Sequence, residues 1–246
     1  MNRKKWYWII GIAAAIVIAA LIWGASTYKK APGSSPEPTA TDGGRMDHAG
    51  MDHGSGEQEP SGQPEDFNLR GYLEDQDTIM AAMMTDMENI EHSDSASIDF
   101  LTGMIPHHDA AINMAQSYLK YGGAHEVLAP LAQDIITAQT AEIEQMQEMI
   151  ETLRETGAYD EAQAKAYLEA YDGLMDHSMS HAAAKSLDEA FADGMIMHHQ
   201  TAVDMANAIL SHTDEEGVKA LAQTIVEAQE KEISEMRDVL NNLKVS

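Results

Sequence analysis

The feature that most constrains the fold of this chain is an internal repeat. Residues 100–115 read FLTGMIPHHDAAINMA and residues 191–206 read FADGMIMHHQTAVDMA, with shared residues at one constant offset. A second match follows, between AQTAEIEQM at 138–146 and AQEKEISEM at 228–236. Self-similarity of this kind indicates that the folded part of the chain is a duplication.

Hydrophobic periodicity and helix-stop residues predict that each copy is helical. Aromatic residues make up only 6% of the chain, whereas strands favour aromatic and β-branched side chains, so the composition also favours an all-α fold. Gly122 and Gly157 are of the kind that ends helices, and the short loops predict antiparallel neighbours. We therefore expect an up-and-down bundle over residues 67–246, in which four long helices form two duplicated hairpins and two shorter helices lead in. The helices are expected at residues 69–92, 97–121, 126–155, 160–175, 185–211 and 215–243, with the first repeat at about 77–157 and the second at about 160–246.

The amino terminus has the pattern of a membrane segment. An uncharged run from Trp6 to Trp23 follows three basic residues, and at 1.5 Å per residue it spans about 27 Å, close to the thickness of a bilayer core. We expect residues 1–30 to be a transmembrane signal anchor that leaves the rest of the chain outside the cytoplasm. The alternative is a cleaved signal peptide, because residues 24–26 are small, and the protein would then be secreted.

Residues 31–66 are rich in Pro, Gly and acidic side chains, a composition that predicts a disordered tether. The tether contains a doubled Met-Asp-His motif. Because a disordered segment has no core to pack into, packing does not explain this motif, and its Met and His side chains are candidate metal ligands. They are Met46, His48, Met51 and His53.

Each repeat places a His pair beside methionines on one helix face. Residues three and four apart are neighbours on a helix, so Met104 can share a metal ion with His107 or His108. Met114 lies two turns further along the same helix and suits a second site better than the first. The second repeat has the same set and adds Met197 where the first has Pro106. The candidate ligands are Met104, His107, His108, Met114, Met195, His198, His199 and Met205.

The following helix of each copy has a stripe that contains a carboxylate. These stripes are Gln139-Glu142-Met146 and Gln229-Glu232-Met236 in the sequence. Ligating imidazoles usually donate their other N–H to a carboxylate, so we expect these residues to support the histidines. The supporting residues are Glu142, Glu232, Met146 and Met236.

Two further methionine clusters have different interpretations. The cluster at residues 175–181 repeats the Met-Asp-His of the tether and alternates His with Met, which favours metal binding by Met175, His177, Met179 and His181. The stripe at the first helix is explained by core packing at least as well as by ligation. Its members are Met80, Met83, Met84 and Met87.

The identity of the metal follows from the chemistry of the ligands. The chain has no Cys, so its soft ligands are drawn from 17 methionines. Thioethers select Cu(I), imidazole accepts Cu(I) and Cu(II), and zinc gains little from methionine, so copper is the expected cofactor. The net charge of -26 suits a cation, and with only 15 basic residues the chain is not expected to bind nucleic acid.

These residues resemble the bacterial family described as domain of unknown function 305, whose hallmark is Met-Ile-Pro-His-His followed by Ala-Ile-x-Met-Ala. Residues 104–108 and 111–115 match this pattern, and residues 195–199 and 202–206 match it except for Met197 in place of Pro. The resemblance covers about residues 77–243. It implies a ferritin-like helical bundle, export from the cytoplasm and, in some members, copper binding linked to copper tolerance.

We therefore expect a membrane-tethered, extracytoplasmic protein that sequesters copper or passes it to a copper-handling partner, without enzymatic activity. A ferritin-like di-metal oxidase is one alternative, but such sites use paired Glu-x-x-His motifs, which neither repeat contains. The other alternative is a metal-independent module whose acidic surface binds a cationic partner.

Overall fold

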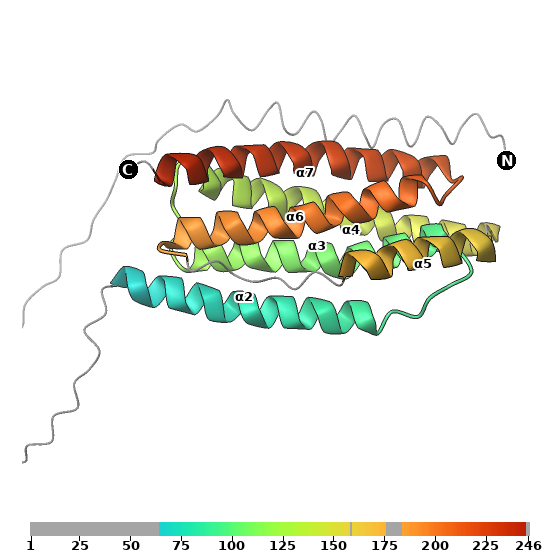
Figure 1. Cartoon of the computed structure of the whole chain (residues 1–246), viewed down its shortest axis with the longest axis horizontal. Coiled ribbons are helices and arrows are strands. Elements are labelled where there is room, and N and C mark those ends of the chain that lie inside the picture. Colours follow the sequence, from blue (N-terminus) through green and yellow to red (C-terminus); the bar gives the residue numbers. More distant parts are fainter. Residues whose placement is uncertain (1–63, 158, 176–183, 245–246) are drawn as a thin grey trace, which may run out of the picture. The chain divides into compact units, whose positions relative to one another are not determined.

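The computed structural model describes residues 64–157, 159–175 and 184–244, which belong to the unit Ser61–Ser246. The side chains of residues 64–66 and 173–175 lie outside this description. The described residues contain six helices and no strands (Figure 1), which confirms the predicted all-α class for this part of the chain. The helices are α2 (Pro64–Glu88), α3 (Ala96–Lys120), α4 (Leu128–Thr156), α5 (Glu161–Met175), α6 (Leu187–Leu210) and α7 (Glu216–Leu243).

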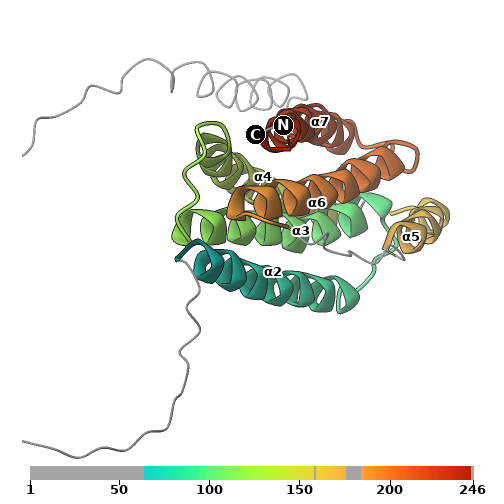
Figure 2. The same ribbon diagram turned by 60° about the vertical axis from the view of Figure 1, so that its left-hand side comes forward.

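Helices α3 and α6 form the central pair of the bundle. They contact each other, α3 also packs against α4, and α6 also packs against α7. Both α2 and α5 lie against the α3–α6 pair, on the side away from α7 in Figures 1 and 2. The two repeats therefore supply equivalent hairpins, α3–α4 and α6–α7, whose first helices meet in the middle.

Equivalent serines start the two central helices. Ser95 Oγ accepts a hydrogen bond from the Ile98 N–H at the start of α3, and Ser186 Oγ accepts one from the Glu189 N–H at the start of α6. These bonds satisfy backbone donors that have no partner inside the helix. The predicted stops are also present, since Gly122 and Gly157 have positive φ angles of 89° and 68°, which glycine adopts without strain.

Helix α2 differs from the prediction. It begins at Pro64 and ends at Glu88, whereas helix was expected at residues 69–92, so residues 64–66 are helical although they were assigned to the tether. Proline is tolerated in the first helical turn, where its missing N–H has no partner in any case. With 25 residues α2 is as long as α3, and the prediction of two shorter leading helices is correct only for α5, which has 15 residues.

Contacts at both ends of α3 and α6 define how the two helices are oriented. At one end Tyr118 stacks on Phe191 with ring centroids 4.2 Å apart, and at the other end Ser97 and Thr213 share a hydrogen bond of 2.5 Å between their hydroxyls. These contacts show that α3 and α6 are antiparallel. The fully buried alanines of the pair include Ala111, Ala115, Ala202 and Ala206.

Within the described part of the chain, no helix combines the length and the apolar character needed to cross a membrane. The predicted signal anchor at residues 1–30 and the tether up to residue 63 lie outside the described residues.

Candidate metal centre

His107 of α3 and His198 of α6 meet at the contact between the central helices and occupy equivalent positions in the two repeats. Their ring centroids lie 3.8 Å apart, with the ring planes inclined by 40°. The side chains are 0% and 1% exposed, and their ring nitrogens have no hydrogen-bond partner among the described residues. Each neutral ring therefore buries an N–H and a lone pair without partners, which is rare in folded proteins.

Burial keeps these two rings neutral. It lowers the pKa of His107 well below its ordinary value of 6.5, and the nearby His108 and His199 lower this pKa further. Burial likewise lowers the pKa of His198, with smaller contributions from the neighbouring histidines. A neutral imidazole keeps one nitrogen lone pair, which is the form that binds a metal ion.

The second histidine of each pair bonds a carboxylate on the following helix. His108 Nε2 lies 2.8 Å from Glu142 Oε2, and His199 Nε2 lies 2.6 Å from Glu232 Oε2. Because a carboxylate only accepts hydrogen bonds, we infer that Nε2 is the donor in each bond, which leaves Nδ1 as the nitrogen that could bind a metal ion. Both Nδ1 atoms are buried without a hydrogen-bond partner among the described residues. This is the arrangement in which a carboxylate orients a ligating imidazole.

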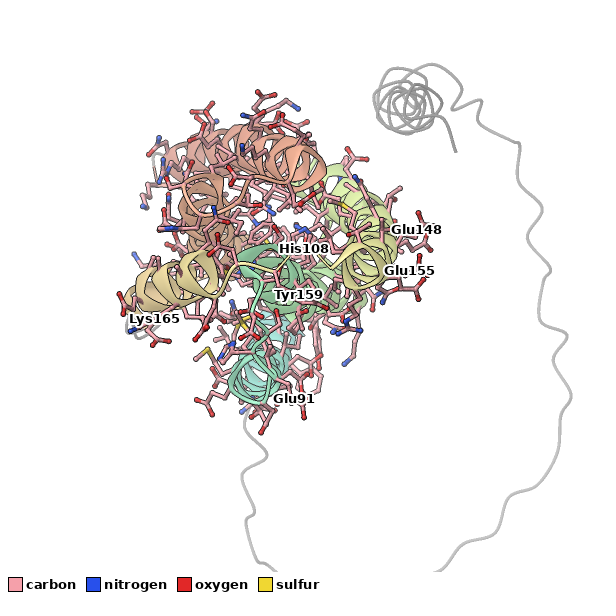
Figure 3. The ribbon with its side chains drawn as sticks, turned by 90° about the vertical axis from the view of Figure 1, so that its right-hand side faces the viewer. Glu91, His108, Glu148, Glu155, Tyr159 and Lys165 are labelled. Atoms are coloured by element: carbon pink, nitrogen blue, oxygen red, sulfur yellow. The ribbon has the colours of Figure 1, made fainter. Side chains whose placement is uncertain are left out.

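The carboxylates lie at the edge of the interior. Glu142 and Glu232 are 18% and 16% exposed, whereas their histidine partners are 0% exposed. Figure 3 shows His108 among the helices, while Glu148 and Glu155 of α4 point away from the bundle. The two histidine–carboxylate bonds therefore connect the buried rings with the solvent boundary of α4 and α7.

The candidate methionines lie within the same interior. The bond between His108 and Glu142 fixes the register of the antiparallel helices α3 and α4, so Met104 and Met146, each four residues away, lie at one level. The bond between His199 and Glu232 places two methionines of α6 and α7 in the same way. The methionines that are 0% exposed are Met104, Met114, Met146, Met195, Met205 and Met236.

Met114 and Met205 reach across to the other repeat. Met114 Cε lies 3.4 Å from the position that a Cβ would take on Gly194, the residue before Met195. Met205 Cε lies 3.7 Å from the corresponding position on Gly103. Each methionine therefore approaches the start of the His/Met motif in the opposite copy, and its role as a ligand stays a prediction.

Part of the candidate set lies outside the described residues. Met175 ends α5, but its side chain is among those not described. Across residues 67–157, 159–172 and 184–244, no three His, Asp or Glu side chains gather into a group that could hold a metal ion. The described candidates thus combine imidazoles with thioethers, a donor set that suits a soft metal. The other undescribed candidates are Met46, His48, Met51, His53, His177, Met179 and His181.

The sequence did not reveal the contact between His107 and His198. The signal that could have found it is symmetry, because in a duplicated antiparallel helix pair the residues near the symmetry axis meet their own copies. The buried amides of Gln139 and Gln229, each 3% exposed, were noted only as members of a stripe. Their Oε1 atoms have no hydrogen-bond partner among the described residues and add polar atoms to this interior.

Comparison with known proteins gives a family and several relatives. The family model described as Domain of unknown function (DUF305) matches residues 35–150 and again residues 151–240. The solved structure of CopM in the Cu(I)-bound form is 27% identical and the match covers 60% of this chain and 96% of that chain, with a TM-score of 0.46. The crystal structure of a DUF305 fragment from Deinococcus radiodurans is 28% identical, with coverage of 60% and 96% and a TM-score of 0.42. An uncharacterized protein, L153, of Acanthamoeba polyphaga mimivirus is 36% identical over 58 residues, which are 24% of this chain and 38% of that protein's length.

Proposed function

The chain belongs to the domain of unknown function (DUF305) family, and from this premise we propose that it is an extracytoplasmic copper-binding protein that sequesters copper or transfers it to a partner. The duplicated histidines and methionines of the α3–α4 and α6–α7 hairpins are the proposed binding site. The physiological consequence of such binding is copper tolerance.

The adjacent imidazoles of His107 and His198 carry this proposal. Two neutral rings bury four polar groups that have no hydrogen-bond partner among the described residues, and each such group costs about 1–3 kcal/mol. This cost is present in both copies of the repeat, and a metal ion that binds the lone pairs would offset it. The residues present therefore fit a metal ion.

The metal proposed is copper because the interior that encloses the imidazoles also contains six fully buried methionines. Met104 and Met146 lie at one level, one helical turn from His108, and the second repeat has the same arrangement. Copper in either oxidation state accepts imidazole, and Cu(I) also prefers thioether sulfur, whereas zinc gains little from it.

We propose binding rather than catalysis because the candidate ligands are enclosed. The four histidines and the six methionines described above are at most 1% exposed, so a bound ion would be shielded from larger substrates. The extracytoplasmic location and the membrane anchor rest on the apolar run at residues 6–23.

Metal titration of the full chain tests the proposal. We would add Cu(I) and Cu(II) separately and count bound ions by native mass spectrometry. The wild type would be compared with a bundle variant, in which leucine replaces the four bundle histidines His107, His108, His198 and His199. Leucine has a volume close to that of histidine, and circular dichroism would show whether the variant stays helical. A matched control variant has alanine at Met46, His48, Met51 and His53.

The proposal predicts that the bundle variant loses ions that the control variant retains. If the bundle variant stays helical and binds as many ions as the wild type with the same affinity, these four histidines are structural and the proposed site is wrong.

A further inference from the structure

The buried face of α2 contains three methionines that the site described above does not include. Met80, Met83 and Met87 are 8%, 2% and 4% exposed. Their spacing of three and four residues places them on one face of the helix, in line with the buried Tyr72 and Gln76. This face packs against the α3–α6 pair.

Helix α2 runs parallel to α6. Near the middle of α2, Asp75 accepts a hydrogen bond of 2.9 Å from the Ser117 hydroxyl near the end of α3. Just beyond the end of α2, Ile90 Cδ1 lies 3.9 Å from the position that a Cβ would take on Gly103, near the start of α3. Helix α2 is therefore antiparallel to α3, as α6 is, so α2 and α6 share one direction.

Gln76 fixes the register between these parallel helices. Its amide lies so close to Gly194 that a Cβ on the glycine would overlap Gln76 Nε2. Equal steps along two parallel helices reach equal levels, and steps of four and eleven residues return to nearly the same helix face. The residues that share a level after these steps are Met80 with His198 and Met87 with Met205.

A second contact supports the register near the end of α2. Met205 Cε and Ile90 Cδ1 lie 3.7 Å and 3.9 Å from the same Cβ position on Gly103. Met205 therefore lies close to the segment that follows Met87. This agrees with the shared level of Met87 and Met205 that the Gln76 contact indicates.

Covering the α3–α6 pair does not in itself require methionine. Helix α5 packs on the same pair through aromatic rings, since Tyr167 packs edge-on to Phe100 and Tyr171 Cε2 lies 3.8 Å from the Cβ position of Gly103. On α2 three of the buried positions hold thioethers. One of them, Met80, lies at the level of His198, whose two ring nitrogens have no hydrogen-bond partner among the described residues. Metal binding therefore explains the methionines on α2 better than packing alone does.

We propose that Met80, Met83 and Met87 are ligands for a soft monovalent cation, Cu(I) or Ag(I), and form with His198 and Met205 a second binding region between α2 and α6. The inference rests on the proposed function in that both bind the same class of metal. It adds a helix outside the two hairpins to the metal-binding part of the protein, with a row of thioethers about 10 Å long from Met80 to Met87.

Methyl NMR tests the inference directly. The full chain would be labelled with ¹³C at the methionine methyl groups and titrated with Ag(I), a diamagnetic probe that replaces Cu(I). Single Met→Leu variants assign the resonances. Met149, half-buried on α4 and outside both proposed regions, is the internal control. Native mass spectrometry would compare the wild type with the triple variant M80L/M83L/M87L and with M149L.

The inference predicts that the three α2 methyl resonances shift with stoichiometric Ag(I), that the Met149 resonance does not, and that the triple variant binds at least one ion fewer than M149L. If the methyls of Met104 and Met195 shift while those on α2 do not, the α2 methionines are packing residues and the inference is wrong, although the proposed function stands. If no methionine methyl of the bundle shifts, both proposals fail. If the α2 methyls shift equally in the variant that lacks His107, His108, His198 and His199, His198 is not a ligand of this region and that part of the inference is wrong.

Discussion

Replacing the adjacent histidines His107 and His198 by leucine, in the double variant H107L/H198L, should stabilise the metal-free protein. The two rings contribute four buried polar groups that have no hydrogen-bond partner among the described residues. Apolar side chains of similar volume remove this cost and keep the apolar contacts, whereas most substitutions of fully buried residues destabilise a fold.

The magnitude follows from the geometry. At the lower bound of about 1 kcal/mol for each unpartnered group, the four groups together give a gain of about 4 kcal/mol. The contact of the rings at 3.8 Å is lost, which costs about 1 kcal/mol. The net gain of about 3 kcal/mol should raise the melting temperature by about 6–12 °C in a folded unit of this size.

Thermal unfolding in the presence of a copper chelator measures this effect. The matched control is H108L/H199L, which removes two unpartnered Nδ1 atoms but also breaks the bonds to Glu142 and Glu232. Because hydrogen bonds to charged groups stabilise by about 1.5–3 kcal/mol each, this loss offsets the gain, and the melting temperature should not rise. With copper added, the wild type should melt at a higher temperature and H107L/H198L should lose that rise. A metal-free H107L/H198L protein that melts below the wild type would refute the reasoning.

Three further outcomes are expected. The free energy of unfolding of the metal-free wild type should fall as the pH drops below 6.5. Burial holds the pKa values of His107 and His198 below that value in the folded state, whereas the same side chains take up protons in the unfolded chain. Urea titrations at two pH values should show this loss of stability in the wild type, and the loss should be absent from H107L/H198L. Gly103→Ala should stabilise the protein by up to about 1 kcal/mol through helix propensity. Gly194→Ala should stabilise it less, or destabilise it, because the new Cβ would overlap the Gln76 amide of α2. Equal changes in the denaturation midpoints of the two variants would contradict this. Ser186→Ala should lower the stability by about 1 kcal/mol through loss of the α6 cap, and Ser186→Asp should restore it in the same assay.

The sequence predicted the helices well where local signals define them. The repeat, the apolar period and the glycines at 122 and 157 specify where α3, α4, α6 and α7 lie, because these signals act within one helix. The start of α2 was missed because Pro64 lies in a segment whose overall composition is that of a tether. One favourable first-turn residue is not visible against such a background.

The candidate site was only partly predictable. The bonds of His108 to Glu142 and of His199 to Glu232 follow from two adjacent helices of one hairpin, whose register a short loop restricts. The contact of His107 with His198 joins helices far apart in the sequence, and their register depends on small residues such as Gly103 and Gly194. A pattern of residue types within one helix contains no information on that register, and the metal-binding roles remain predictions.

The central claim is that the duplicated histidines and methionines of the bundle bind copper. Anomalous diffraction at the copper absorption edge, from crystals of the copper-loaded protein, tests it most directly. The account predicts anomalous peaks inside the bundle, within bonding distance of the His107–His198 pair or of the Nδ1 atoms of His108 and His199. Copper bound with no anomalous peak inside the bundle would contradict it.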